Sequence, residues 1–462
     1  MLHTRGGGEM LKPNVSYCRQ ENEVHYNPWT WADAYLTFVA TEAGTFTFRP
    51  GKNNIISYST DNGSTWTEGS SIEVNSGDKV LWKGTMTPIS GNGIGYFSST
   101  GKFDVQGNVM SLLYGDDFKG EVDLTEKSDA FVNLFRGNTK VVSAENLSLP
   151  ATTLASGCYS YMFFGCTSLT TAPVLPATTL ASNCYDSMFS NCTVLVTAPV
   201  LPATTLVNKC YYNMFSGCTA LVTAPSILPA TTLADSCYQS MFSGCKSLTT
   251  APELPATTLV NKCYYYMFNG CTALVTAPSI LPATTLASYC YQYMFNGCTA
   301  LVTAPSILLA TTLVDDCCQS MFQNCTSLTT APELPATTLA SYCYRSMFSG
   351  CKSLTTAPEL PATTLADGCY YNMFSGCTAL VTAPVLPATT LVSSCYSRMF
   401  QGCSSLNYIK AMFTTTPSTT YTSNWVSGVS SSGTFVKNSD ATWNVTGVHG
   451  IPTGWTVETA SA

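Results

Sequence analysis

Residues 158–183 read CYSYMFFGCTSLTTAPVLPATTLASN, and this unit decides the fold because it occurs ten times along the chain. Successive copies begin every 26 residues, or every 27 residues where SIL replaces VL or EL after the TAP triplet. A fixed period of this length is typical of a chain that winds into stacked coils. The copies begin at Cys158, Cys184, Cys210, Cys237, Cys263, Cys290, Cys317, Cys343, Cys369 and Cys395.

A degenerate copy, AFVNLFRGNTKVVSAENLSLPATTL, precedes the ten regular ones. It has Ala130 and Asn138 where the regular copies have their two cysteines. The first coil of a stack must face water or another domain on one side, so its sequence departs from the consensus. We predict that this segment is a capping repeat.

Each copy contains signals for one short helix and one short strand. Ser156 lies two residues before the first cysteine, and the equivalent position is Ser, Asn or Asp in every copy, as a helix N-cap requires. Gly165 precedes the second cysteine, where Gly or Asn tolerates the left-handed turn that ends a helix. These signals predict a helix of about two turns between them. Thr and Val around TSLTTAP favour a strand, which Pro173 ends.

A short helix plus a short strand per 26–27 residue coil predicts a repeat solenoid of the leucine-rich-repeat type. The competing fold is a parallel β-helix, whose coils do not usually carry a capped helix. The unit MF-x-G-C-x-x-L…LP resembles the BspA-type leucine-rich repeats that are common in gut bacteria and in the phages that infect them. The resemblance covers about residues 117–413.

This resemblance implies a surface or virion-associated adhesion protein without catalytic activity. Family members on the bacterial surface usually carry an export signal, whereas residues 1–18, MLHTRGGGEMLKPNVSYC, show no apolar core of that kind. The difference favours a phage virion or tail-associated protein over the alternative, a bacterial cell-surface adhesin, and a structural scaffold is the third interpretation. We therefore expect the chain in a virion or at an extracellular cell surface.

The flanking segments predict further domains. Residues 35–116 alternate apolar and polar residues between Gly, Asn and Asp turns, which favours a β-sandwich-like domain. Residues 1–34 are expected to form a linker or docking segment, and residues 1–116 together offer a surface for a homo-oligomer or a virion assembly partner. Residues 117–413 then form the solenoid, and residues 414–462 form a β-rich C-terminal cap.

Composition excludes two classes of partner. The net charge is −7 with only 10% charged residues, so no basic stripe exists to bind a nucleic-acid backbone. A run of about 18 apolar residues, which a membrane span needs, is also missing from the sequence, so we expect no membrane insertion. A bacterial surface glycan or protein remains as the expected partner.

The 22 cysteines do not predict a metal site or an enzyme. The two cysteines of a copy are eight residues apart, or about 12 Å along a helix, which is too far for a disulfide within one copy. None of the three histidines lies in the repeats, so neither a zinc ligand set nor a base for a thiol nucleophile is present there. We predict buried free thiols in columns, with bridges between adjacent coils as the alternative, and no cofactor.

A motif in the first domain matches a pattern seen in sialidases. Ser59, Asp61, Gly63, Thr65 and Trp66 match S-x-D-x-G-x-T-W, the Asp-box. Sialidases carry several copies and an arginine cluster, whereas this chain shows one copy and no such cluster. The motif therefore predicts a hairpin turn that Trp66 anchors.

Candidate ligand-binding residues come from differences among the copies. The second and third residues after each first cysteine vary freely, while MF, LPATTL and TAP hardly change. Tyr, Ser, Asn and Arg dominate there, and tyrosine gives a large contact area at low entropic cost. Drift of exposed helix positions explains the same variation without a ligand. The candidate residues are Tyr161, Tyr212, Asn213, Tyr265, Tyr266, Tyr293, Arg345, Tyr371, Asn372 and Arg398.

The strand side of the coils is the second candidate surface. It is nearly constant from copy to copy and would suit a repetitive ligand such as a glycan. The threonine pairs of PATTL, beginning with Thr152 and Thr153, are expected to form hydroxyl ladders between coils. Ice-binding proteins use similar arrays, but ladders also let coils satisfy each other's polar groups.

Overall fold

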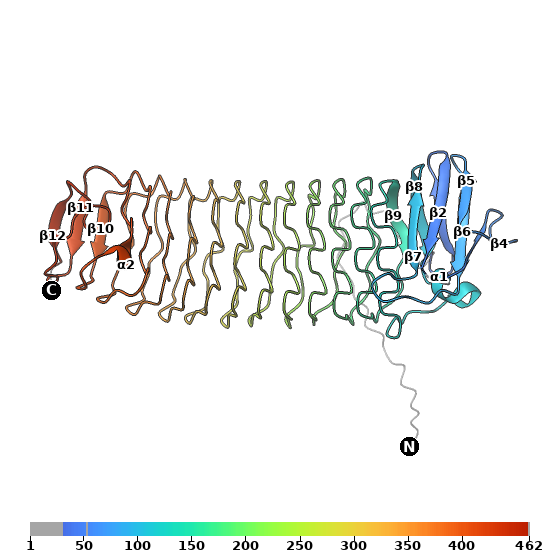
Figure 1. Ribbon diagram of the computed structural model, residues 1–462, viewed down its shortest axis with the longest axis horizontal. Helices are drawn as coiled ribbons and strands as arrows, with labels where there is room; N and C mark the ends of the chain where they lie inside the picture. The colour runs from blue at the N-terminus through green and yellow to red at the C-terminus, as the bar shows by residue number, and fades with distance from the viewer. Residues whose placement is uncertain (1–30, 52–53, 461–462) are drawn as a thin grey trace, which may run out of the picture.

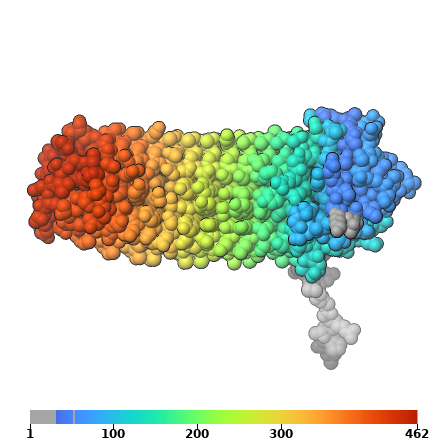
Figure 2. Space-filling model, in the orientation of Figure 1, coloured from blue at the N-terminus to red at the C-terminus, as the bar shows by residue number. Residues whose placement is uncertain are grey.

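The computed structural model describes residues 31–51 and 54–460. A β-domain lies at one end, a nearly straight column of stacked coils follows, and three short strands lie at the other end (Figure 1). The space-filling view shows one continuous elongated body without a gap between these parts (Figure 2). The expected linker or docking segment lies almost wholly outside the described residues.

The β-domain consists of two sheets that share an aromatic core. The larger sheet has the strand order β4-β3-β6-β1-β8-β9, and the smaller has the order β5-β2-β7. Phe38 on β1 packs edge-to-face on Phe46 of β2 and on Phe97 of β7, and Trp82 of β6 packs on Phe97. The strands are β1 (Leu36–Ala40), β2 (Gly44–Pro50), β3 (Ile56–Ser59), β4 (Thr67–Glu68), β5 (Ser71–Val74), β6 (Lys79–Gly84), β7 (Gly95–Ser99) and β8 (Phe103–Asn108).

The Asp-box forms the turn between β3 and β4. The Asp61 carboxylate accepts hydrogen bonds from the Ser59 hydroxyl and from both the amide and the hydroxyl of Thr65. These bonds lower the pKa of Asp61 to about 2. Trp66 packs edge-on against Tyr35, 4.9 Å between ring centroids. The motif is thus a hydrogen-bonded turn held by a tryptophan, as the sequence predicts.

The first coil is joined directly to the β-domain. Strand β9 (Val141–Ser148) pairs in parallel with β8 and so belongs to both the larger sheet and the coil stack. The Phe97 amide donates to the Leu134 carbonyl at 2.7 Å, and the Asn138 side chain donates to the Phe97 carbonyl at 3.2 Å. The degenerate copy therefore forms a coil that caps the stack against this domain.

The predicted helix in each copy is wrong. Among the described residues the only helices are α1 (Ser111–Tyr114), the 3-10 helix η2 (Gly115–Asp117) and α2 (Thr419–Thr422), and none lies in the ten regular copies. The Ser160, Met162 and Phe164 amides donate three residues back, to Gly157, Tyr159 and Tyr161, rather than four residues back as in an α-helix. The segment is a succession of β-turns.

The other amides of this segment bond to the next coil instead of to their own. Tyr159, Tyr161 and Phe163 donate to the carbonyls of Cys184, Asp186 and Met188, each at 2.9 Å. Every fourth residue has a positive φ, and this backbone conformation points alternate N–H groups along the axis of the stack, toward the next coil. In the first copy these residues are Gly157 (64°), Tyr161 (55°) and Gly165 (71°). Gly165 therefore has the predicted left-handed conformation, but not at a helix end.

The predicted strand is reduced to single bridges between coils. Threonines of the TAP segment pair in parallel with their counterparts, and threonines of PATTL form a second series of bridges, including Thr153 with Thr179 and Thr258 with Thr285. The threonines of both series are mostly exposed on the outer surface of the stack. The longest series runs through Thr250, Thr276, Thr303, Thr330, Thr356 and Thr382.

Columns of identical side chains fill the inside of the coils. The cysteines, the tyrosine after the first cysteine, and the Met-Phe pair are buried in each copy. Stacked phenylalanine rings lie nearly parallel, for example Phe242 and Phe268 with centroids 5.6 Å apart and planes 2° apart. Cys318 replaces the tyrosine in one copy and interrupts that column between Tyr291 and Tyr344.

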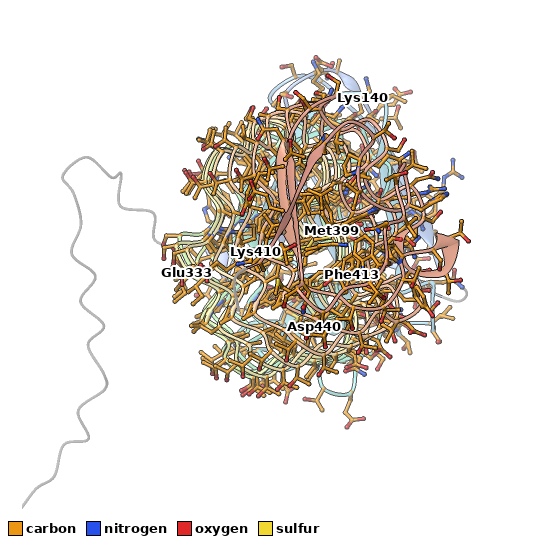
Figure 3. All side chains as sticks on the ribbon, turned by 90° about the vertical axis from the view of Figure 1, so that its left-hand side faces the viewer. Lys140, Glu333, Met399, Lys410, Phe413 and Asp440 are labelled. Atoms are coloured by element: carbon orange, nitrogen blue, oxygen red, sulfur yellow. The ribbon has the colours of Figure 1, made fainter. Side chains whose placement is uncertain are left out.

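The stack continues past residue 413, where the sequence places the start of a separate cap. Strands β10 (Tyr408–Ala411), β11 (Thr434–Lys437) and β12 (Thr456–Thr459) form a parallel sheet in this order. Trp425 takes the place of the repeat methionine, and its carbonyl accepts from the Phe400 amide at 2.8 Å. The view along the stack shows Met399 and Phe413 in the interior and Glu333 at the margin (Figure 3).

Candidate functional site

The candidate residues lie on the outer side of the β-turn segments. We call the second and third residues after each first cysteine the turn stripe. The candidate residues on it are partly exposed, except for Arg398, which is exposed. The third residue is the one with positive φ, for example Asn213 (51°), Tyr266 (55°) and Arg398 (55°). The candidate residues thus lie on turns rather than on the predicted helices, and they face solvent, whereas other members of the stripe, such as Ser160 and Gln292, are buried.

Three of the candidate tyrosines form one cluster on adjacent coils. Tyr266 and Tyr293 stack with ring planes 3° apart and centroids 4.6 Å apart. Tyr265 stands perpendicular to both, with centroids 4.3 Å from Tyr266 and 6.3 Å from Tyr293. The neighbouring coils have Ser240 and Ser320 at the position of the stacked pair. The cluster is therefore flanked by small side chains on both sides.

Cations accompany several of these rings, and the sequence identified Arg345 but not its neighbour Tyr342, nor Lys209. Lys209 lies 5.7 Å from the centroid of Tyr212. Arg345 lies 5.4 Å from Tyr342 and 5.3 Å from Tyr371, between two rings. Lys209 and Tyr342 both stand directly before a first cysteine, a position that also varies among the copies. Variation at that position was the signal that could have found them.

The remaining candidates are separated along the stack. Tyr161, in the first regular copy, has Arg136 above its ring at 5.2 Å, whereas Arg398 belongs to the tenth copy. Asn372 donates to the Ser346 hydroxyl at 3.2 Å, which ties two coils together. The backbone N–H of Asn213 donates to the Gln239 carbonyl of the next coil, as the backbone N–H at this position does in every copy. The ten residues therefore form a long stripe with one aromatic cluster, and not a single pocket.

Burial shifts the pKa values of ionisable groups along the stripe. Burial and a hydrogen bond with Tyr266 raise the pKa of Tyr265, so its hydroxyl stays protonated at neutral pH. Burial also raises the pKa of Asp186, although a hydrogen bond from Ser187 and the charge of Lys209 oppose that shift. The Tyr265 hydroxyl therefore offers a neutral hydrogen-bonding group beside the ring faces.

The interior offers no reactive group to the surface. All 21 cysteines in the part of the chain that the structure describes are buried and unpaired, and all of them except Cys318, which takes a tyrosine position, lie in the predicted columns. Burial raises the pKa of Cys271 and of Cys351 to about 12, so both thiols are protonated at neutral pH and are poor nucleophiles. Within the same residues, no group of three or more His, Cys, Asp or Glu side chains is placed to hold a metal ion.

Comparison with known proteins identifies the family. The family model described as BspA type leucine rich repeat region matches residues 139–275, 226–355 and 306–424, with six copies. These matches span more than half of the chain, so the protein belongs to this family, and the resemblance of its repeat unit is confirmed. Proteins of the family generally act in binding and adhesion at surfaces and are typically not enzymes.

One solved structure is similar, and no curated protein matches the chain. It is the crystal structure of a leucine-rich repeat protein from Bacteroides ovatus, with a TM-score of 0.38 and 16% sequence identity. The similarity covers 81% of this chain and 97% of that one.

In the residues described, no helix is both long enough and apolar enough to cross a lipid bilayer.

Proposed function

We propose that the protein is a non-catalytic adhesion protein whose turn stripe binds a glycan on a bacterial surface. The observation that carries this proposal is the cluster of Tyr265, Tyr266 and Tyr293, three partly exposed rings held in fixed mutual orientation. Ordered aromatic residues on an outer surface lose little conformational entropy when a ligand binds.

The chemistry of the cluster suits a sugar ring. The C–H face of a sugar packs on the electron-rich face of an aromatic ring, while tyrosine hydroxyls and nearby side chains bond its hydroxyl groups. Ser240, at the same position in the preceding coil, is a small and partly exposed side chain, so a sugar ring that packs on Tyr266 meets no bulky residue at that position. The stripe continues over further coils with Tyr212 and Tyr371, so a polymeric glycan would meet several rings.

Two settings fit this function. Our sequence-based prediction is a phage virion or tail, and the alternative is a bacterial cell surface, where proteins of this family typically occur. A structural scaffold is the third interpretation. Two further expectations stay predictions. One is the set of domain boundaries at residues 34/35, 116/117 and 413/414, and the other is assembly through residues 1–116. Immunogold labelling of purified phage particles and of intact cells would distinguish the two settings.

The experiment measures binding of the purified chain to gut bacterial cells, with and without periodate treatment of their surface sugars. The test variant is Tyr265→Gln, Tyr266→Ser and Tyr293→Ser, which gives this cluster residues that other coils have at the same positions. The control variant is Val222→Ala, Val275→Ala and Val302→Ala, which changes exposed residues outside the stripe. We expect periodate and the tyrosine variant each to reduce binding about tenfold or more, and the valine variant to bind normally.

Other outcomes would change the proposal. Binding that survives periodate but is lost on protease treatment of the cells would replace the glycan with a protein ligand. Binding that survives the tyrosine variant would move the site away from the turn stripe. No binding to any strain would favour the scaffold interpretation.

A further inference from the structure

Three grooves lie on a different surface, where the chain turns after each TAP triplet. The first lies between residues 170–174 and 196–200, the second between 331–335 and 358–361, and the third between 359–361 and 385–387. Their volumes are about 490, 490 and 260 Å³. The first two are as large as typical small-molecule sites. We call these the corner grooves.

The length of the coils explains where these grooves lie. Each corner groove separates two neighbouring coils of 26 residues. In the coils of 27 residues, the extra residue places a serine and an isoleucine at this corner, for example Ser279 and Ile280. The backbone N–H of Ser279 also donates to the Glu253 carboxylate at 3.2 Å, so that carboxylate has a hydrogen-bond partner. The three corner grooves thus all lie between coils that lack the inserted residue.

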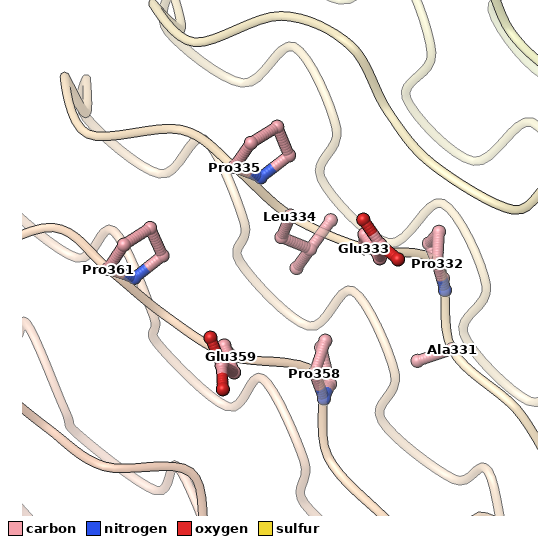
Figure 4. Close-up of a pocket in the computed structure, with 8 residues that line it drawn as sticks. All are labelled: Ala331, Pro332, Glu333, Leu334, Pro335, Pro358, Glu359 and Pro361. Carbon is pink, nitrogen blue, oxygen red and sulfur yellow. The ribbon is translucent and has the colours of Figure 1, made fainter.

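All three corner grooves are lined by the residue after the TAP triplet, and they differ in the charge of that residue. The first has Val174 and Val200 there, with Glu145 of the preceding coil also lining it. The second has Glu333 and Glu359, and the third has Glu359 and Val385. The second groove therefore has a carboxylate on each of its two coils (Figure 4).

The two carboxylates of the second groove have no partner among the described residues. Glu333 and Glu359 are both exposed and form no side-chain hydrogen bond or ion pair there, unlike Glu253. Prolines 332, 335, 358 and 361 line the same groove together with the buried Leu334 (Figure 4). The groove therefore combines proline and leucine side chains with two exposed carboxylates, one on each coil.

We propose that the second corner groove docks a protein partner through a lysine side chain on an extended segment. The proline and leucine walls fit the aliphatic stem of lysine. An ammonium group has three donors and is able to bond carboxylates on both walls at once. An amino sugar has the charge but no such stem, and its hydroxyl groups would face apolar walls without partners. The site is separate from the turn stripe and does not depend on the proposed glycan binding.

Isothermal titration with tetralysine at low ionic strength tests this proposal, with Nε-acetylated tetralysine as the uncharged probe. We expect one bound tetralysine per chain, no binding of the acetylated peptide, and weakening by added salt. Glu333→Val with Glu359→Val reproduces the valines of the first corner groove, and we expect it to weaken binding about tenfold. The tyrosine variant of the turn stripe should bind tetralysine normally, so failure of the two proposals is distinguishable.

A transplant variant gives the sharper test. Val174→Glu with Val200→Glu places the second groove's carboxylates in the first groove, and we expect the stoichiometry to rise from one to two. Unchanged affinity in the Glu333→Val, Glu359→Val variant would overturn the proposal, and so would a transplant that stays at one site. Glutamate-dependent binding of a chitosan tetramer without binding of tetralysine would replace the protein partner with an amino glycan.

Discussion

Neighbouring residues of one turn segment belong to two different regions, the interior columns and the turn stripe. Tyr264 is 1% exposed and stacks in the interior, whereas Tyr265 and Tyr266, the next two residues, lie partly exposed on the outside. Along the segment two residues point inward and the next two outward, with a period of four. The inward positions hardly change among the copies, because each side chain must fit the one below it, whereas the outward positions are free to differ.

The pH dependence of stability tests the interior, and we expect the largest effect there. Burial keeps the repeat thiols protonated, with the pKa of Cys271 at about 12 against 9.0 for an exposed thiol. Below about pH 9 the thiols are protonated in both states and stability does not change. Above it, thiols of the unfolded chain ionise first, so each buried thiol lowers the free energy of unfolding by about 1.4 kcal/mol per pH unit.

Because burial raises the pKa of many repeat cysteines, among them Cys271, Cys351 and Cys403, we expect a cooperative alkaline unfolding transition that begins just above pH ~9. Far-UV circular dichroism against pH, followed together with tyrosinate absorbance, measures it. Return to neutral pH under reducing conditions should restore the signal. A fold that persists to about pH 11, while its thiols react freely with alkylating reagents, would mean that the columns are open to solvent.

A pair of substitutions in one copy compares the two regions directly. Phe268→Ala removes a fully buried ring from the stacked column, and we expect a loss of about 3–5 kcal/mol in the free energy of unfolding. Val275→Ala in the same copy changes a side chain that is 46% exposed, and we expect a change of about 0.5 kcal/mol or less. Urea denaturation of both variants measures the difference. Similar losses for the two would contradict an interior packed in columns.

The smallest expected effect concerns the backbone of the turn stripe. Ser240 has a φ of 55°, where residues other than glycine are strained, whereas the adjacent Gln239 has no positive φ. Both substitutions increase the conformational entropy of the unfolded chain, which lowers stability. In Ser240→Gly the relief of backbone strain in the folded state offsets this loss, whereas in Gln239→Gly nothing offsets it. We expect Ser240→Gly to be more stable than Gln239→Gly by about 1–2 kcal/mol. Thermal unfolding of the two variants checks this, and equal melting temperatures would refute it.

The error in predicting a helix has a specific cause. Cys158 and Met162, and likewise Tyr159 and Phe163, are spaced four residues apart with the same burial. A helix of 3.6 residues per turn and a succession of turns with a period of four both produce this pattern over eight residues. Gly165 was interpreted as the end of a helix, whereas positive φ recurs at every fourth residue, including Tyr161. Because tyrosine rarely takes this conformation, the sequence did not signal it.

The sequence predicted which residues belong to the candidate site, but not how their side chains are arranged in space. Variation among copies selected Tyr265, Tyr266 and Tyr293, because outward positions are free of the packing that restricts the columns. Their perpendicular and stacked orientation, and the position of Arg345 between two rings, depend on the distance between coils. The corner grooves depend on contacts between residues about 26 apart, which a reading of one copy does not include.

The sequence by itself determined the period, the capping repeat, the burial of the repeat cysteines and the family, because an interior built from identical layers repeats its side chains in order. The tertiary structure alone decided the path of the backbone within each layer. Amides that a helix would satisfy locally bond instead to the next coil, as Tyr159 does to Cys184. A bond of this kind forms only when a second coil is in place, so no single copy can specify it.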